Sequence, residues 1–347
     1  MEDVKVYSKE DYHYLFDRNT GYFLRWGKTP DDDPTWCKYG NEILDIEIST
    51  ICHGLGNPCP WCYKTNTEIG KNMSFETFKQ IINLMPDTLT QIAFGVGDLN
   101  GNPDLWDMTR YARSKKIIPN ITINGFNLTD NEIFNLNKYM GAISVSRYGN
   151  GEVCYNAVKR LLNAGCKYVN IHQLVSEETF DNCMQAITDI SENKSTLFGG
   201  LNAIVFLALK PKGNRNTLTP LTDINKYTEL INYAIDRNIR FGFDSCSAPK
   251  FLATIKDNEQ FKEYEAMSES CESTLFSLYC NVDGEFFPCS FTEGEEGWGS
   301  GINYKDVLEF KDIWYNSKMM LFRNRLLDTT KSSEFKNCRN CPIFKLD

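Results

Sequence analysis

The stretch Cys52-His-Gly-Leu-Gly-Asn-Pro-Cys59-Pro-Trp-Cys62 places three cysteines on one short segment. It follows an apolar run, residues 43–48, that predicts a strand. Three thiolates just past a strand end indicate a metal site. Tetrahedral zinc would need a fourth Cys or His, for which His53 is a candidate. A four-iron cluster held by three cysteines would instead leave one iron open to a substrate or cofactor. Both interpretations are open at this point.

Outward from this stretch, strand and helix patterns alternate up to about residue 209, in six βα steps with short connections. This order predicts a parallel sheet with helices outside it, an α/β fold. Six steps are too few for a complete eight-unit barrel, so we expect a partial (β/α)6 TIM-like barrel with its chemistry at the carboxyl ends of the strands. The predicted strands are 43–48, 90–94, 120–123, 142–145, 168–175 and 201–209, followed by a helix at 222–237 and a short strand at 239–243.

Composition and charge narrow the class of protein. The chain has 347 residues, a net charge of −9 and a pI near 5.1, which argues against nucleic acid or an anionic membrane as its partner. No apolar run is long enough to span a membrane, and the start Met-Glu-Asp-Val-Lys does not resemble a signal peptide. We therefore expect a cytoplasmic protein, in which thirteen cysteines indicate metal ligation rather than disulfides.

Three regions are expected. Residues 1–40 contain an aromatic hairpin, predicted at 12–16 and 22–26, which we interpret as a substrate-facing extension, although a plain packing face is the simpler reading. Residues 41–248 form the barrel. Residues 249–347 form a second module.

The second module has its own cysteine pattern. Cys271, Cys289 and the pair Cys338 and Cys341 surround an Asp283-Gly284 hairpin signal. On chemistry alone, these four cysteines fit an all-cysteine zinc site and a fully ligated four-iron cluster equally well. Cys280, within the predicted hairpin, is an alternative to Cys271.

Both cysteine patterns resemble those of a known family. Cys59-Pro-Trp-Cys62, followed by Tyr63, resembles the cluster loop of the radical S-adenosylmethionine (SAM) superfamily, where the usual spacing is Cys-x3-Cys-x2-Cys; six residues separate the first two cysteines here. Cys-x12-Gly-x4-Cys and then Cys-x2-Cys-Pro resemble the auxiliary-cluster extension of such proteins, the SPASM and shorter twitch forms. The resemblance implies two [4Fe-4S] clusters, on Cys52, Cys59 and Cys62 and on Cys271, Cys289, Cys338 and Cys341.

Several strand ends resemble the SAM-binding segments of the same superfamily. Phe94-Gly-Val-Gly-Asp98 resembles its Gly-Gly-Glu-Pro element, with Asp98 in place of the glutamate that receives the SAM amino group. Thr122-Ile-Asn-Gly125 and Val145-Ser-Arg-Tyr-Gly149 resemble the ends of its third and fourth strands. A guanidinium beside the serine would suit the SAM carboxylate. The SAM contacts that the resemblance implies are Trp61, Gly97, Asp98, Asn124, Ser146 and Arg147.

The resemblance implies an activity. A reduced cluster would cleave SAM, and the resulting 5′-deoxyadenosyl radical would abstract hydrogen from a substrate. We expect a peptide or protein substrate, as in the maturation of ribosomally made peptide products (RiPPs), with a separate leader-binding protein and with flavodoxin or ferredoxin as reductant. Cys246, after the last strand, is a candidate hydrogen-atom donor, with a small buried residue as the plainer reading.

Two alternatives differ from this expectation. One is a radical SAM dehydrogenase or rearrangement enzyme that acts on a small molecule. The other, from a different class, is a zinc-stabilised binding protein without catalysis. Iron and sulfide analysis of the anaerobically purified protein would separate the two classes.

Overall fold

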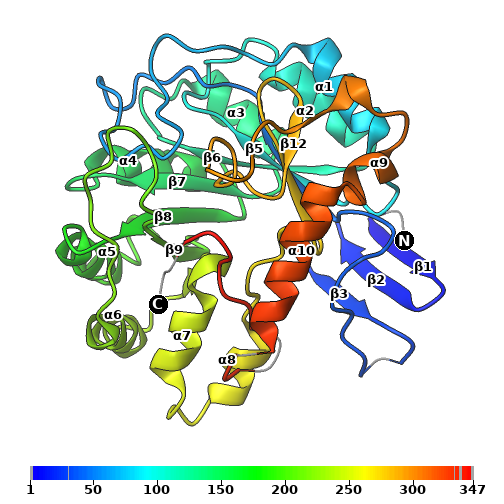
Figure 1. Ribbon diagram of the computed structural model, residues 1–347. Coiled ribbons are helices and arrows are strands. Elements are labelled where there is room, and N and C mark those ends of the chain that lie inside the picture. The colour runs from blue at the N-terminus through cyan, green and yellow to red at the C-terminus, as the bar shows by residue number, and fades with distance from the viewer. Residues whose placement is uncertain (1–2, 30, 332, 336–337, 345–347) are drawn as a thin grey trace.

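A curved parallel sheet dominates the computed structural model, which describes residues 3–29, 31–331, 333–335 and 338–344 (Figure 1). Its neighbouring strands pair parallel and follow the order of the chain, so each strand lies beside the next one in sequence. The strands of this barrel are β4 (Ile43–Glu47), β5 (Gln91–Gly95), β6 (Ile118–Ile123), β7 (Ile143–Arg147), β8 (Val169–Val175), β9 (Ala203–Ala208) and β10 (Phe241–Phe243).

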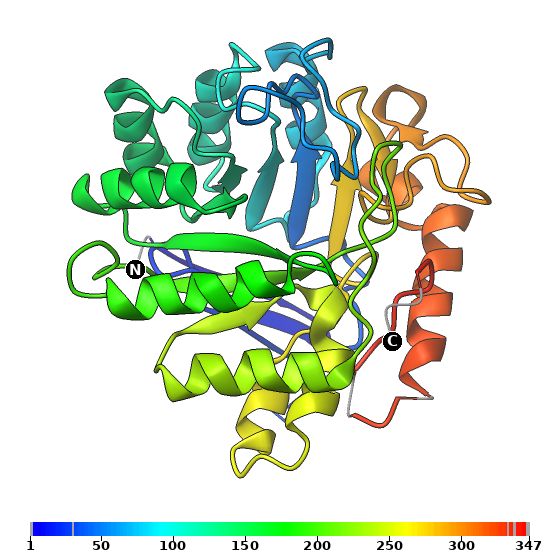
Figure 2. The same cartoon turned by 90° about the vertical axis from the view of Figure 1, so that its left-hand side faces the viewer.

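A helix connects each barrel strand to the next, and these helices lie along the outside of the sheet (Figure 2). Local signals fix where they begin: the Ser74 side chain accepts a hydrogen bond from the Thr77 N–H, and Thr129 forms a capping box with Glu132. The expected partial (β/α)6 barrel is confirmed. The helices are α1 (Phe75–Leu84), α2 (Leu105–Ser114), α3 (Asp130–Tyr139), α4 (Glu152–Asn163), α5 (Phe180–Glu192) and α6 (Ile224–Asp236).

The C-terminal region is joined to the barrel through the sheet itself. Strand β11 (Ser277–Cys280) pairs parallel with β4, and β12 (Glu285–Phe287) and β13 (Ile302–Asn303) follow it as antiparallel neighbours. Backbone groups at the free edge of β4 are thereby satisfied by residues more than two hundred positions later in the chain. The helices of this region are α7 (Ala248–Ile255), α8 (Phe261–Met267), α9 (Phe310–Trp314) and α10 (Ser317–Thr330).

The N-terminal residues form a separate sheet of β1 (Val4–Lys9), β2 (Tyr12–Asp17) and β3 (Phe23–Trp26). It packs against the amino ends of the barrel strands: the Tyr14 hydroxyl donates to the Thr88 carbonyl at 2.8 Å, and Arg18 Nε donates to the Lys116 carbonyl at 3.1 Å. The predicted chemistry lies at the opposite, carboxyl edge of the barrel, and the substrate-facing role of residues 1–40 stays a prediction. The aromatic residues form a packing face.

The described residues contain no helix with the length and apolarity that crossing a membrane requires.

Candidate functional site

The three cysteines of the first motif lie on a loop at the carboxyl edge of β4. The Cys52 N–H donates to the Thr67 carbonyl at 2.8 Å, and the Cys62 N–H donates to the Cys59 carbonyl at 3.3 Å. Gly54 has a left-handed backbone, with φ of +62°, and a Cβ there would collide with the Asn57 carbonyl. The turn after Cys52 therefore requires glycine.

The three thiols lie within electrostatic reach of one another. Burial raises the pKa of Cys52 to about 11, and the thiols of Cys59 and Cys62 add to the rise. Burial also raises the pKa of Cys59, with a further contribution from Cys62. The phenol of Tyr148, whose pKa is raised by burial and by the same three thiols, faces the group from the end of β7. A bound cation would stabilise the thiolate forms of these cysteines.

Asp98 connects the loop after β5 to the cysteine loop. Its Oδ2 accepts a hydrogen bond from the His53 N–H at 2.8 Å and lies 2.6 Å from His53 Nδ1. Its Oδ1 accepts from Asn124 Nδ2 at 3.0 Å, and the same amide donates to the Gly54 carbonyl at 3.2 Å. Asp98 and Asn124 therefore hold the cysteine loop in place, at the positions where the sequence predicted SAM contacts.

Two glycines approach the cysteine loop more closely than any other residue type would permit. A Cβ on Gly97 would collide with the Ile51 carbonyl and come within 2.5 Å of Cys52 Cβ. Gly213, with φ of +104°, lies equally close to the Cys62 carbonyl. These contacts explain why glycine occupies both positions, since any larger residue would displace the loop.

One cation beside the loop has a donor without a partner. Arg215 Nη2 donates to the Asn66 carbonyl at 2.9 Å and to the Cys59 carbonyl at 3.5 Å. Its buried Nε has no hydrogen-bond partner in the described part of the chain. The unpaired Nε–H of Arg215 is suited to donate a hydrogen bond to an anion bound at the loop.

These residues fit a cluster that has three protein ligands. Three cysteines lie on one loop, the half-buried Arg215 donates to the Cys59 carbonyl, and two glycines leave the loop closely enclosed. Among the residues that the structure describes, no group of three or more His, Cys, Asp or Glu side chains is placed to hold a single metal ion.

The strand-end residues of β7 divide between the two faces of the sheet. Ser146 lies beside Tyr148, whose ring centroid is 6.0 Å from that of Trp61, so Ser146 and Trp61 both lie near the cysteines. Arg147 points the other way, where its Nη1 donates to Gln173 Oε1 at 3.0 Å and its Nε donates to the Tyr155 hydroxyl at 2.6 Å. Successive strand residues alternate in direction, so only one of the pair can face the site. The structure does not place Arg147 there.

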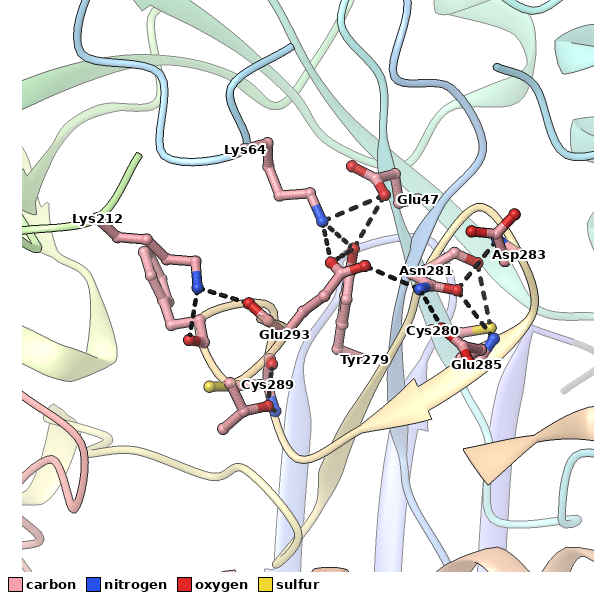
Figure 3. Close-up of polar contacts among 12 residues, drawn as sticks. Glu47, Lys64, Lys212, Tyr279, Cys280, Asn281, Asp283, Glu285, Cys289 and Glu293 are labelled. Atoms are coloured by element: carbon pink, nitrogen blue, oxygen red, sulfur yellow. Dashed lines mark hydrogen bonds and ion pairs between the residues drawn. The ribbon is translucent and has the colours of Figure 1, made fainter. Parts of the chain in front are cut away.

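A buried polar network lies between the cysteine loop and the C-terminal hairpin (Figure 3). Lys64, two residues after Cys62, forms ion pairs with Glu293 and with Glu47 Oε2, the latter at 3.3 Å. Its Nζ also donates to the Tyr279 hydroxyl at 2.7 Å. That hydroxyl lies 3.1 Å from a carboxylate oxygen of each glutamate.

This network, which we call the Lys64 network (Glu47, Lys64, Tyr279 and Glu293), is absent from the sequence-based site. Its members come from β4, the cysteine loop, β11 and the loop after β12. No local pattern marks them, because Glu47 and Lys64 meet Tyr279 and Glu293 more than two hundred positions later in the chain. The only signal in the sequence is a lysine two residues after Cys62. Arg215 and Tyr148 were also missing from the predicted site residues, because the residues that they contact in the cysteine loop are distant in the sequence.

The structure brings together only part of the predicted auxiliary set. Burial raises the pKa of Cys271, Cys289 and Cys246, and Cys341 adds to the rise in each case. Cys338 is buried instead among Phe251, Leu252 and Ile255. Cys280 lies in the barrel core with its Sγ directed at the Asn281 carbonyl, and the nearest charged groups are carboxylates. It is not placed to substitute for Cys271.

Solved structures match most of the chain, whereas no family model matches the sequence and no curated protein gives a significant match. Streptococcus suis SuiB bound to S-adenosylmethionine gives a TM-score of 0.66 at 14% identity, over 89% of this chain and 77% of SuiB. SuiB bound to its precursor peptide SuiA gives 0.70 at 13% identity, over 92% and 88% of the two chains. Native anSMEcpe with bound AdoMet and Cp18Cys peptide gives 0.58 at 15% identity, over 82% of each chain.

At these identities the likeness shows the fold. The chain has the same architecture as these solved structures, and the α/β partial barrel predicted from the sequence is confirmed.

Proposed function

We propose that this protein is a radical SAM enzyme that modifies a peptide or protein. The observation that carries the proposal is the position of the cysteine loop, which places Cys52, Cys59 and Cys62 at the carboxyl edge of a partial barrel, where Asp98 accepts from the His53 N–H and Arg215 donates to the Cys59 carbonyl. A [4Fe-4S] cluster on these residues, with SAM at its open iron, would supply a 5′-deoxyadenosyl radical for hydrogen abstraction.

The chain's own residues would position the cluster and SAM. Asp98 has both oxygens engaged, yet a carboxylate offers about four acceptor sites, so it can still receive the SAM amino group while it holds the His53 backbone. Arg215, with its unpaired Nε, is better suited to the SAM carboxylate than Arg147, which is occupied elsewhere. Trp61, Asn124 and Ser146 complete the proposed SAM contacts.

The Lys64 network would close one side of this site. It joins the cysteine loop to the hairpin with buried ionic contacts, and such contacts are favourable only where their geometry is fixed. We infer that it holds the C-terminal region against the barrel mouth, which would keep water away from a reactive substrate radical.

Peptide as the substrate is supported by the solved neighbours. SuiB has been solved with its precursor peptide SuiA, and anSMEcpe with the Cp18Cys peptide. Their matches cover 92% and 82% of this chain. A leader-binding partner and a flavodoxin or ferredoxin reductant belong to the same proposal.

The proposal can be tested with a variant in which Cys52, Cys59 and Cys62 are all replaced by Ala. After anaerobic reconstitution, the wild type should form deoxyadenosine from SAM under dithionite, and the variant should form none. The control is Cys166→Ala, a buried cysteine outside the site. Deoxyadenosine from the triple variant would refute the assignment of the ligands. Mass spectrometry of candidate peptides incubated with SAM and reductant would then identify the substrate.

A further inference from the structure

Asp45 lies in the middle of β4 and is exposed to solvent, although β4 is a central strand of the sheet. Its register partners are Ala93 on β5 and Tyr279 on β11, so both edges of β4 are paired at this point. Leu44 and Ile46, on either side of Asp45, are buried in the core that the sheet forms with α1 and α2. Because side chains alternate along a strand, Asp45 points to the other side of the sheet, which we call the inner face.

The inner face of the barrel is accessible to solvent. On β5, β8 and β9 the residues that belong to the core are buried, and the residues between them are partly exposed. A complete eight-stranded barrel fills its interior with layers of large side chains. The partly exposed residues here include Ala93 and Gly95 beside β4, and Asn170 and His172 on β8. A ligand can therefore reach Asp45 from solvent.

The Asp45 carboxylate has no hydrogen-bond or ion-pair partner in the described part of the chain. Of its two neighbours, Ala93 carries no donor, and the Tyr279 hydroxyl is engaged with Lys64 and Glu47. Burial alone raises the pKa of Asp45 to about 6, so the group is still ionised at neutral pH. A charge inside a protein is costly without a partner, and this one can gain its partner from a ligand.

Asp45 is also close to the cysteine loop. It lies one inner-face position before Glu47, a step of about 7 Å along a strand. Glu47 forms an ion pair with Lys64 at 3.3 Å, and Lys64 follows Cys62 by two residues. The chain thus supplies a cation to Glu47, and the next carboxylate on the same face has none.

We propose that Asp45 is a specificity-determining residue that binds a cationic group of the substrate, the side chain of a Lys or Arg residue in the peptide. This role rests on the proposed function and deepens it by naming a feature of the substrate. A carboxylate accepts charge-assisted hydrogen bonds from ammonium and guanidinium groups. The net charge of −9 on the chain would also attract a basic peptide.

Two other cations have to be considered. A divalent metal ion would need several ligands, and the described residues include no group of three or more His, Cys, Asp or Glu side chains that could hold one. SAM carries a sulfonium and an amino group, and either could be the positive charge that Asp45 meets. The experiment therefore has to separate the peptide from the cofactor.

The probe is a randomised library of short peptides, acetylated and amidated at their ends so that only side chains are charged. Immobilised, reconstituted protein with SAM retains part of the library, and mass spectrometry sequences the retained peptides. The wild type should enrich Lys and Arg over the input library. In Asp45→Asn this enrichment should disappear, and a retained Lys peptide should bind about tenfold more weakly, the usual effect of losing one charge-assisted hydrogen bond. Asp45→Glu should keep the enrichment.

The matched control is Asp130→Asn, which removes a fully exposed carboxylate from α3 and should enrich basic peptides like the wild type. Absence of enrichment in the wild type, or enrichment that persists in Asp45→Asn, would overturn the assignment. Loss of SAM binding in Asp45→Asn would assign the carboxylate to the cofactor and overturn it as well. Urea unfolding of the apoproteins should find Asp45→Asn no less stable than the wild type, and a less stable variant would contradict the absence of a partner.

Deoxyadenosine formation by the wild type, measured without peptide, tests the proposed function separately. A protein that forms none is not a radical SAM enzyme. A protein that forms deoxyadenosine and retains no excess of basic peptides keeps its proposed function and loses only the role of Asp45.

Discussion

At the scale of single residues, Gly97 gives the sharpest prediction. In Gly97→Ala the new methyl group would press on the Ile51 carbonyl and Cys52. We expect the apoprotein to lose about 1–3 kcal/mol of unfolding free energy, the usual cost of overpacking. Urea unfolding measures this, with Gly242→Ala as control, since a Cβ there meets nothing within 4 Å. Equal stability of the two variants would contradict the close approach.

Asp98 gives the second prediction at this scale. Asp98→Asn removes a charge-assisted hydrogen bond to the SAM amino group, which contributes about 1.5–3 kcal/mol. Equilibrium binding to the reconstituted protein should therefore weaken on the order of tenfold to a hundredfold. Asp130→Asn, at a fully exposed surface position, should bind SAM normally. Unchanged affinity in Asp98→Asn would mean that the carboxylate serves only the cysteine loop.

Residue-scale features were predictable where the chemistry is local. The cysteine triplet and the glycine segment before Asp98 are continuous in sequence, so their proximity to a strand end follows from the strand pattern. The contacts of Arg147 with Tyr155 and Gln173 were not predicted, because a segment of strand does not reveal which side of its pleat meets the helices. Lys64 and Arg215 gave no signal, because their partners are distant in the chain.

At the scale of elements, the Lys64 network joins the cysteine loop to β11. Lys64→Met leaves the buried Glu47 without its cation, and breaking such a pair costs about 3–5 kcal/mol. We expect the lower part of this range, because the Glu293 side chain is 26% exposed. The matched control is Lys71→Met, which breaks an ion pair on the surface and should cost less than about 1 kcal/mol. Similar losses in both variants would contradict a buried network.

The same variant predicts a pH dependence. Burial already raises the pKa of Glu47 in the folded protein, and removing Lys64 takes away the largest opposing influence. A carboxyl whose folded pKa exceeds its unfolded value of about 4.3 stabilises the fold at low pH and loses that contribution as the pH rises. The penalty of Lys64→Met should therefore be smaller near the unfolded pKa than at neutral pH. Urea unfolding of the wild type and of Lys64→Met at both pH values measures this penalty. A penalty that does not change with pH would contradict the burial of Glu47.

At the scale of the whole molecule, the N-terminal sheet should be separable from catalysis. Leu24, on its outer face and 49% exposed, can be changed to Lys with no effect on SAM cleavage. Tyr14 is fully buried against the amino ends of the barrel strands. Its replacement by Ala should lower the free energy of unfolding by about 3–5 kcal/mol. Loss of product formation in Leu24→Lys, with the fold and SAM cleavage intact, would support the substrate-facing prediction.

The barrel itself could be predicted because each βα step is local and periodic. The position of the N-terminal sheet could not be predicted, because it depends on contacts between distant segments. The pairing of β11 with β4 could not be predicted either, because a strand's partner is set by tertiary packing rather than by its own sequence.

That pairing has a consequence for how the protein is made. Ile43 pairs with Ser277, so roughly 230 residues must leave the ribosome before the first barrel strand meets its outer neighbour. At about 5–20 residues per second, the nascent chain carries an open strand edge for on the order of ten to fifty seconds. During that interval the edge can pair with other chains, and a chaperone that shields it would raise the yield of the folded protein.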